Sequence, residues 1–529
     1  MNVVFRVDAS NLMGTGHVMR CRTLASALQL RGAHIRFITR KHPGHLAEVM
    51  ARDGFHVELL PEPNGVGCET GYAGWLGVSQ EEDALQTIVA LKGLACDLLV
   101  VDHYALDSVW ESLLRPHGLK IMVIDDLANR PHNCDVLLDQ NYSLSGPERY
   151  RPWVQESCQL LLGPRYALLR PEYAQIRETM APRTGCVRRI LIYMGGSDIP
   201  NMTGIALEAL SASRLQQLEV DVVIGSNFIH QDKVIRFAKT RTNTRVFGQQ
   251  LHLAHLMASA DLAIGAGGAT TWERLCMDLP SLVICTADNQ VLATEATVSS
   301  GLVRYLGIAK HVTVEAIELA VQQELVAAER NGKQHKSNAP VVDGRGAQRV
   351  TEILLPTLIS NLALRPANAG DVMTYFVWVN DPKVRSSAIN SSTIDLKSHI
   401  NWFGLALDKS DSKLYVLEAN GLPIGQVRFE RQGEVTVIDY SLDHDVRGRG
   451  WGRQLIQLGI ASLLNAATET ISLCATVRDS NLVSAAIFER LGFARCGIKV
   501  NQDQSCFRLV VPTLAGSSID VDSIGCGSD

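Results

Sequence analysis

The sequence lacks long apolar runs, a strong net charge and a large share of aromatic residues. Phe, Trp and Tyr make up 6% of its 529 residues, and the formal net charge at pH 7 is −5. No uninterrupted apolar run reaches the ~18 residues of a membrane-spanning helix, and the charge is too small to indicate a nucleic-acid partner. Arg6 and Asp8 interrupt the first apolar stretch, which argues against a secretory signal. We therefore expect a globular, cytoplasmic protein with no nucleic-acid or membrane partner.

The cysteines are scattered, and no two have C-x-x-C spacing. Twelve cysteines in a chain of this length do not form a disulfide scaffold, so we expect free thiols and no structural zinc site. Two histidine pairs, His42 with His45 and His252 with His255, have spacings that a metal could use. Because no third ligand accompanies either pair, we interpret them as surface histidines and expect no bound metal.

The first part of the chain alternates short apolar runs with longer amphipathic ones. Helices are predicted over 18–30 and 82–94. The runs rich in Leu and β-branched residues predict buried parallel strands over residues 3–7, 35–39, 98–102, 120–124 and 136–139. This strand–helix alternation is typical of a Rossmann-like layer.

The same rhythm returns near residue 187, after a proline-containing stretch (154–183) that we interpret as a linker. Helices are expected over 201–210 and 270–277, and a further helix after Gly346 is expected to close this lobe. Strands are predicted over 189–194, 220–224, 262–265 and 281–285. Two such lobes in tandem place a ligand cleft between them, at the carboxyl ends of the strands.

The last part of the chain differs from the first two. Residues 414–419 and 424–430 flank Asn420 and Gly421, which predicts a β-hairpin. A third strand is expected over 435–443, followed by a glycine-rich turn that opens a helix. The complete organisation predicts an N-terminal lobe over 1–170, a second lobe over 185–355, a third domain over 364–512 and a disordered tail over 513–529.

A glycine–histidine turn follows the first predicted strand. Gly14 and Gly16 permit a tight turn, and His17 comes at the start of the next helix. An imidazole can accept a proton near neutral pH, and a helix N-terminus disfavours the imidazolium. His17 is therefore a candidate base, although a structural capping role explains the same position. Asp125 and Asp126 follow a later strand and either line the cleft or cap local structure.

Glycines also end two strands of the second lobe. Gly195 and Gly196 follow the first of them, and Gly265, Gly267 and Gly268 follow the third. Their backbone N–H groups could face an anion, with Thr270 and Thr271 adding hydroxyl donors. Glu273, one turn further, could accept hydrogen bonds from two ribose hydroxyls. The sequence therefore predicts a nucleotide diphosphate site, with close helix–strand packing as the alternative.

These segments together resemble the UDP-sugar hydrolases of pseudaminic acid biosynthesis, over about residues 1–350. The motifs are GTGHVMRCRTLA at 14–25, VDHY at 101–104, IDD at 124–126, LLDQN at 137–141, GPRYALLRPE at 163–172, MGGSD at 194–198 and ADNQ at 287–290. The resemblance implies two Rossmann-like lobes of GT-B type. It also implies metal-free hydrolysis of UDP-2,4-diacetamido-2,4,6-trideoxy-β-L-altropyranose with inversion, with His17 as catalytic base. The implied substrate contacts are Gly16, Tyr104, Gly195, Ser197, Gly268, Thr270, Glu273 and Asn289.

The C-terminal part resembles the GNAT N-acetyltransferases, an α+β fold, over about residues 364–510. Its glycine-rich turn opens a helix whose N–H groups could clasp a pyrophosphate. The resemblance implies acetyl-CoA as co-substrate, held by Arg447, Gly448, Arg449, Gly450, Trp451 and Gly452, with Asn481 and Ser484 beside the pantetheine and thioester. Segments 378–385 and 399–403 further resemble the acetyltransferase that acts on the 4-amino group of a UDP-linked altrosamine, one step before the hydrolase. The whole chain would then be a bifunctional sugar-nucleotide enzyme.

One residue departs from the GNAT pattern. Many members have a Tyr where this chain has Phe488, and that Tyr protonates the departing thiolate. Tyr440 or water could replace it, and water relayed to Asp439 or Glu430 could deprotonate the amine. The alternative functions for the chain are a GT-B glycosyltransferase fused to an acetyltransferase, or a domain that binds its ligand without catalysis. The sequence leaves the oligomeric state open.

Overall fold

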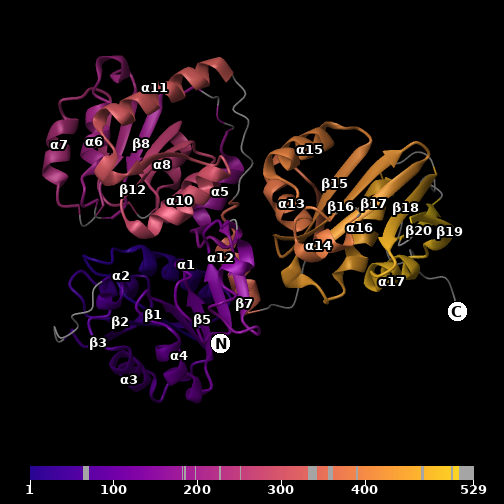
Figure 1. Ribbon diagram of the computed structural model, residues 1–529, viewed down its shortest axis with the longest axis horizontal. Helices are drawn as coiled ribbons and strands as arrows, with labels where there is room; N and C mark the ends of the chain where they lie inside the picture. Colours follow the sequence, from indigo (N-terminus) through magenta and orange to yellow (C-terminus); the bar gives the residue numbers. More distant parts are fainter. Residues whose placement is uncertain are drawn as a thin grey trace. The chain divides into compact units, whose positions relative to one another are not determined.

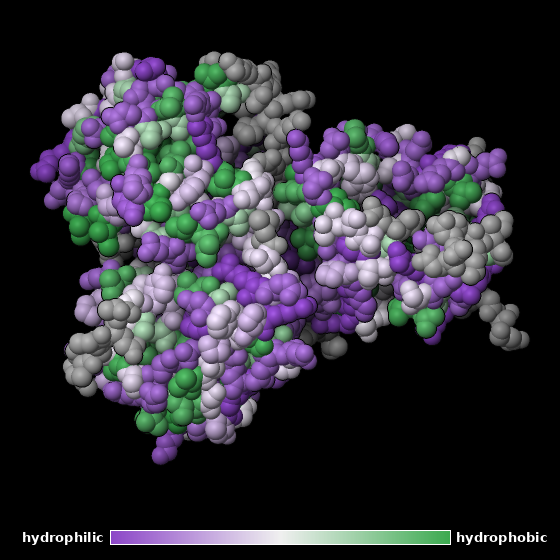
Figure 2. Space-filling view, in the orientation of Figure 1, coloured by the Kyte–Doolittle hydropathy of each residue, from purple (hydrophilic) through white to green (hydrophobic). Residues whose placement is uncertain are grey.

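The computed structural model describes two compact units, Met1–Pro356 and Thr357–Asp529. The described residues are 1–63, 71–143, 145–181, 183, 186–196, 198–225, 228–250, 252–331, 342–355, 362–388, 391–465, 470–501 and 504–511. The tail expected over 513–529 lies outside them. In these ranges no helix is long and apolar enough to cross a membrane. Figure 2 shows hydrophobic residues scattered among hydrophilic ones on the visible face, as is usual for globular proteins.

The first lobe is a seven-stranded parallel sheet, drawn in indigo and purple in Figure 1. Its strand order is β3-β2-β1-β4-β5-β6-β7, and all five strands predicted here are present. The strands are β1 (Asn2–Val7), β2 (His34–Arg40), β3 (His56–Leu60), β4 (Leu98–Asp102), β5 (Lys120–Ile124), β6 (Val136–Asp139) and β7 (Gln159–Leu162). The order reverses between β1 and β4, and ligands of such sheets bind at the carboxyl ends of the strands at that point.

Helices cover both faces of this sheet and bury its apolar strands. Helices α1 (Gly16–Leu30) and α2 (Ala47–Arg52) share one core with Val3, Phe5 and Val7. Helices α3 (Gln80–Leu91) and α4 (Ser108–Leu114) share another with Val4, and Trp110 is completely buried there. The stretch interpreted as a linker is structured in part, because β7 and α5 (Pro171–Thr179) lie within it.

The second lobe is a six-stranded parallel sheet of order β10-β9-β8-β11-β12-β13. Its strands are β8 (Arg189–Tyr193), β9 (Glu219–Val223), β10 (Thr244–Phe247), β11 (Leu262–Ala266), β12 (Ser281–Cys285) and β13 (Arg304–Ile308). Its helices are α6 (Met202–Ala209), α7 (Gln231–Ala238), α8 (Ala254–Ser259), α9 (Thr270–Cys276), α10 (Val291–Ser299) and α11 (Val314–Asn331). The order reverses between β8 and β11, so the two glycine-containing turns predicted to bind a nucleotide follow neighbouring strands.

Helix α12 (Gly346–Leu354) belongs to the first lobe. The prediction that it closes the second lobe is wrong: it contacts α1 and the 3-10 turn η4 (Pro164–Tyr166). Ala347 and Val350 complete the core around α1. A Cβ atom on Gly346 would lie 2.3 Å from the carbonyl oxygen of Ala167, so glycine permits this close approach.

The C-terminal unit is built on a seven-stranded mixed sheet of order β14-β15-β16-β17-β18-β20-β19. The predicted hairpin turns at Asn420 and Gly421, both with positive φ. The strands are β14 (Leu362–Pro366), β15 (Ser412–Ala419), β16 (Leu422–Gln432), β17 (Val435–Leu442), β18 (Ile471–Arg478), β19 (Ala494–Asn501) and β20 (Gln504–Val511). The helices are α13 (Val372–Val379), α14 (Pro382–Ser387), α15 (Leu396–Asp408), α16 (Trp451–Asn465) and α17 (Leu482–Arg490).

Strands β17 and β18 are parallel and pair over a short length only. Residues 435–437 pair with 472–474, and the pairing ends there, although both strands continue. The backbone groups beyond Val437 and Cys474 are therefore not bonded across this gap. Helices α16 and α17, whose residues share one core with the sheet, follow these two strands.

Candidate active site

His17 lies at the start of helix α1, directly after the turn that leaves β1. The turn is closed by an antiparallel bridge between Ser10 and Gly14, and Gly14 has a φ of 76°, a conformation that favours glycine. Thr15 precedes the helix and makes no side-chain cap with it, and Gly16 is exposed. The predicted glycine turn therefore places His17 at the carboxyl ends of the strands.

The His17 ring is held by a carboxylate from the neighbouring strand. Nδ1 of His17 lies 2.6 Å from Oδ1 of Asp102, the last residue of β4. Arg20 donates from Nε to Asp102 Oδ2 and from a terminal nitrogen to Oδ1, each at 2.7 Å. Burial alone would raise the pKa of Asp102, but the charges of Arg20 and His17 outweigh it and hold that pKa far below its usual value.

The charge state of Asp102 assigns the tautomer of His17. An ionised carboxylate can only accept hydrogen bonds, so the proton of a neutral His17 ring is on Nδ1 and is donated to Asp102. A terminal nitrogen of Arg20 also lies 3.2 Å from Nδ1 of His17. Both of these nitrogens carry protons, so neither accepts from the other, and both donate to Oδ1 of Asp102. Nε2 of His17 keeps its lone pair, and the ring can accept a proton there.

Tyr104 and Asn289, both predicted as substrate contacts, meet beside this ring. The rings of Tyr104 and His17 are 4.6 Å apart at 85°. Nδ2 of Asn289, in the turn η6 (Asp288–Gln290) of the second lobe, donates to the Tyr104 hydroxyl at 3.2 Å. Burial, followed by the charge of Asp126, raises the pKa of Tyr104 far above its usual value. The site therefore contains hydrogen-bonding groups from both lobes.

The glycines of the second lobe differ in how much space surrounds them. A Cβ atom on Gly265 or Gly267 would lie 2.5 Å from a side-chain atom of Arg274 or Thr294, respectively, so these two permit close packing. Gly195 has a φ of 95° with open space on its Cβ side, and a Cβ on Gly268 would have ordinary contact at 3.6 Å. Close packing therefore does not account for Gly195 and Gly268, whose contact with a ligand stays a prediction.

Gly196 brings the turn after β8 close to the first lobe. A Cβ atom on Gly196 would lie 3.4 Å from Oγ1 of Thr15, the residue that precedes α1. The turn with Gly195 and the N-terminus of α1 therefore lie side by side. Ser197, also predicted as a contact, lies outside the described residues.

Glu273 and Thr270 occupy the first turn of α9. Thr270 accepts a hydrogen bond from Arg274 at 3.0 Å, so its hydroxyl oxygen is engaged within the helix. Burial raises the pKa of Glu273 to about 7, against the opposing effects of a hydrogen bond from Tyr173 and the charge of Arg274. Glu273 is a partly protonated carboxyl at neutral pH, and its role toward a ribose stays a prediction.

The structure adds four residues that the sequence patterns did not single out. Asp102 and Arg20 orient His17, the ring of Trp75 lies 6.3 Å from that of His17, and the ring of Tyr72 lies 4.9 Å from that of Tyr104. The i, i+3 spacing of His17 and Arg20 places them on one face of α1, and this was a usable signal. Nothing local to residues 72–75 indicates that they approach His17.

A buried ion network lies under the same sheet edge. Arg6 donates to Asp8 at 2.6 Å and to Asp83 at 3.0 and 2.6 Å. His42 is buried, with Nε2 3.7 Å from Asp8 Oδ2, so its interpretation as a surface histidine is wrong. The short loop after β2 folds it inward against the carboxylate.

His103 completes this network in a form that does not suit a metal. Its Nδ1 accepts a hydrogen bond from the Ala105 amide at 3.0 Å, and burial lowers its pKa to about 3. The neutral ring therefore carries its proton on Nε2, 3.5 Å from Asp8 Oδ2. A ring nitrogen that bears a proton has no lone pair for a metal.

The residues predicted to hold acetyl-CoA form a tight turn before α16. Gly448 and Gly450 have φ values of 81° and 82°, with open space on their Cβ sides. Arg447 pairs with Asp381 at 2.9 Å and donates to the Leu442 carbonyl at 3.1 Å. Arg449 stacks over Trp451 at 5.6 Å. These contacts hold the arginine side chains of the turn, and α16 begins directly after it at Trp451.

Asn481, Ser484, Tyr440 and Phe488 lie around the start of α17. Oδ1 of Asn481 accepts from the Ser484 amide at 3.2 Å and so caps the helix. The hydroxyl groups of Ser484 and Tyr440 are 2.9 Å apart. Phe488 is buried, with its ring 5.9 Å from that of Tyr440. Burial raises the pKa of Tyr440 above its usual value.

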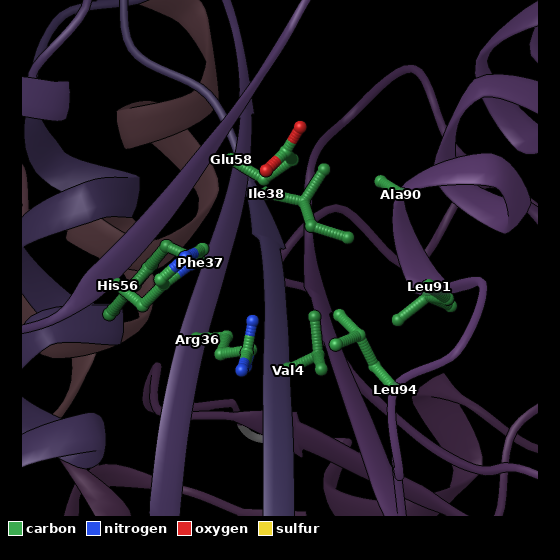
Figure 3. Close-up of a pocket in the computed structure, with 9 residues that line it drawn as sticks. All are labelled: Val4, Arg36, Phe37, Ile38, His56, Glu58, Ala90, Leu91 and Leu94. Carbon is green, nitrogen blue, oxygen red and sulfur yellow. The ribbon is translucent and has the colours of Figure 1, made fainter.

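A small pocket in the first lobe lies away from these residues. Its volume is about 10 Å³, enough for no more than a water molecule. Figure 3 shows side chains of β1, β2, β3 and α3 around it, together with that of Leu94. None of the candidate site residues lines this pocket, so it has no part in the site.

Residues 361–494 match the acetyltransferase (GNAT) domain family. This match lies within the C-terminal unit, which we refer to below as the GNAT domain. The chain is also similar to a spore coat polysaccharide biosynthesis protein, SpsG, of Bacillus subtilis, at 26% identity over 67% of this chain and 98% of that protein. It is also similar to a UDP-2,4-diacetamido-2,4,6-trideoxy-β-L-altropyranose hydrolase of Campylobacter jejuni, at 25% identity over 55% of this chain and 93% of that protein. The resemblance drawn from the sequence is therefore confirmed.

The chain is also similar to solved structures. MurG of Acinetobacter baumannii is 13% identical with a TM-score of 0.43, over 67% of this chain and 99% of that protein. The described sheets themselves establish the fold class as α/β, with two Rossmann-like lobes of GT-B type followed by an α+β GNAT domain.

Proposed function

We propose that the first unit hydrolyses UDP-2,4-diacetamido-2,4,6-trideoxy-β-L-altropyranose to the free sugar and UDP. We further propose that the GNAT domain acetylates the 4-amino group of the UDP-linked precursor with acetyl-CoA. The name of the Campylobacter relative supports the substrate. The observation that carries the hydrolase is the 2.6 Å contact of His17 Nδ1 with Asp102, which puts the lone pair of the neutral ring on Nε2.

In the proposed hydrolysis, Nε2 of His17 removes a proton from a water molecule as that water attacks C1 of the sugar. A bond forms between the water oxygen and C1, and the bond from C1 to the phosphate oxygen breaks, with its electron pair leaving on UDP. The proton stays on His17, where the Asp102 carboxylate stabilises the imidazolium. A single displacement of this kind inverts the anomeric carbon.

The leaving group explains why one base suffices. UDP departs as a stable anion, so a carboxylic acid that protonates it is less necessary than in ordinary glycosidases. Backbone N–H groups of the turns with Gly195 and Gly268 are the proposed donors to the diphosphate. Glu273 is the proposed partner of the ribose hydroxyls.

The experiment is a product analysis by NMR with the UDP-sugar in water alone. We expect free sugar and UDP, with the sugar first appearing in the inverted anomeric form. Substitution His17→Ala should lower the rate by ~10²–10⁴-fold while UDP-sugar binding persists. A requirement for an added acceptor would instead make the unit a glycosyltransferase, and loss of binding in His17→Ala would make His17 structural.

For the GNAT domain, acetyl-CoA would supply the acetyl group. The turn from Arg447 to Gly452 suits its pyrophosphate, because Gly448 and Gly450 have positive φ angles and face open space on their Cβ sides. The hydroxyl of Tyr440, 2.9 Å from that of Ser484, is the proposed donor of the proton that the CoA thiolate takes up. Phe488 cannot supply it.

A further inference from the structure

Three aromatic rings gather beside His17, and we call Tyr72, Trp75 and Tyr104 the aromatic wall. Their centroids are 4.8 Å apart for Tyr72 and Trp75, 4.9 Å for Tyr72 and Tyr104, and 5.6 Å for Trp75 and Tyr104. The ring of Trp75 is 6.3 Å from that of His17. In the proposed hydrolysis, C1 of the sugar must come close to His17, so the aromatic wall would lie beside the sugar.

Two members of the wall remain partly open to solvent. Tyr104 is buried, whereas Tyr72 and Trp75 are half-buried. The 3-10 turn η1 (Ala73–Trp75) is fixed by the next residue, Leu76, which is buried in the first-lobe core. Two side chains of the aromatic wall are thus held in place and remain partly accessible.

Hydrogen-bonding groups lie next to the aromatic wall. The Tyr104 hydroxyl and Asn289 Nδ2 are bonded to each other at 3.2 Å, and Tyr72 also lies close to Asn289 and Asp288. Ligand sites commonly combine an apolar wall with a few polar groups that fix orientation. A hexose beside His17 would therefore meet both hydrogen-bonding groups and aromatic rings.

Ring faces favour carbon-bound hydrogens and penalise hydroxyl groups that find no partner. A sugar that lacks a hydroxyl at C6 and carries acetamido groups offers methyl groups for such contacts. A fully hydroxylated hexose would press an unpartnered hydroxyl against the rings.

We propose that Tyr72 and Trp75 bind the methyl groups of a deoxygenated, N-acetylated hexose and so select it over hydroxylated hexoses. This inference rests on the proposed hydrolase function, and it assigns sugar specificity to two residues of the first lobe. The wall acts on binding of the sugar and takes no part in proton transfer.

The test compares affinities in a His17→Ala background, where the substrate survives. Calorimetry with UDP, the trideoxy UDP-sugar and UDP-N-acetylglucosamine, which has hydroxyls at C4 and C6, gives the contribution of each sugar. We expect Trp75→Ala to weaken binding of the trideoxy UDP-sugar by ~10–100-fold, with UDP affinity unchanged and with the preference over UDP-N-acetylglucosamine lost. Trp75→Phe keeps a ring and should retain most of the preference.

A matched control is Trp153→Ala, which removes a half-buried tryptophan of the same lobe. It should leave all three affinities unchanged. In the catalytically intact background, Trp75→Ala should raise KM for the trideoxy UDP-sugar more than it lowers kcat, since the wall does not touch the transferred proton.

The failure of this inference differs from failure of the proposed function. If the wild-type protein releases no UDP from the trideoxy UDP-sugar, the hydrolase is wrong. Equal affinities for UDP and the UDP-sugar, or a preference that survives Trp75→Ala, would overturn the aromatic wall even if hydrolysis is observed.

Discussion

Nδ1 of His17 lies 2.6 Å from Oδ1 of Asp102, although the two residues are 85 positions apart in the chain. They meet because β1 and β4 are neighbours at the point where the strand order reverses. His17 follows β1 through a short turn, and Asp102 ends β4. The fold therefore places the candidate base and its orienting carboxylate at one edge of the sheet.

Asp102→Asn should slow UDP release by ~10²–10⁴-fold, because an amide neither fixes the Nδ1–H tautomer nor stabilises the imidazolium. UDP-sugar binding should persist, so the effect falls on kcat rather than KM. The measurement is steady-state release of UDP across a range of pH, together with calorimetry of UDP-sugar binding to a His17→Ala variant with and without Asp102→Asn.

Asp126→Asn is the matched control for this carboxylate. Asp126 contacts Arg20 at 2.9 Å and is not bonded to His17 in the hydrogen bonds described. We expect it to slow UDP release far less than Asp102→Asn. Equal kcat values for Asp102→Asn and the wild type would show that His17 does not need this partner.

Glu273→Ala should weaken the affinity for UDP. A neutral hydrogen bond contributes about 0.5–1.5 kcal/mol and one to an ionised carboxylate about 1.5–3 kcal/mol, so loss of the partly protonated Glu273 should cost ~2–100-fold in affinity. Glu273→Gln retains one acceptor oxygen and should lose less. Calorimetry with UDP alone tests this, and unchanged affinity in both variants would remove Glu273 from the nucleotide pocket.

The raised pKa of Glu273 also predicts a pH dependence of stability. The folded-state pKa is about 7 against 4.5 for the free side chain, so the folded protein binds more protons between these values. Stability therefore falls as the pH rises from about 4.5 to 7, by about 3 kcal/mol. Glu273→Gln should remove most of this decline, as measured by unfolding of the first unit at pH 5 and pH 8. A decline of equal size in the variant would assign it to other groups.

The fold was largely predictable from the sequence because parallel strands buried on both faces have continuous apolar runs. The segment around β7 was not, since Gln159–Leu162 is a four-residue strand between proline-containing stretches. Helix α12 was assigned to the wrong lobe because its apolar face is compatible with either core. Only the tertiary contact with α1 distinguishes the two.

The candidate site was predictable where its residues follow strand ends. His17, Tyr104 and Asn289 meet as expected from their motifs. Trp75 reaches His17 from a turn that belongs to neither motif, and no local spacing encodes that approach. Whether the His42 side chain points inward depends on how the short loop after β2 folds, so the sequence could not predict that it is buried.

Separation of the two units should leave both active. The chain divides near residue 356, and each unit has its own buried core. A protein ending at residue 355 should release UDP with the kcat and KM of the full chain. Circular dichroism checks that the shortened protein folds; a folded but inactive product would mean that the GNAT domain contributes to hydrolysis.

Tyr440→Phe should slow acetyl transfer by ~10²–10⁴-fold, because it removes the proposed proton donor to the thiolate. Acetyl-CoA affinity should be unchanged, since the turn from Arg447 to Gly452 is intact. Ser484→Ala is the control: it removes the hydroxyl 2.9 Å from Tyr440 but leaves the phenol, so its effect should be smaller. Thiol release is measured with acetyl-CoA and the UDP-linked 4-amino sugar. If Tyr440→Phe retains the wild-type rate, water is the proton donor, and the pKa that burial raises in Tyr440 has no part in catalysis.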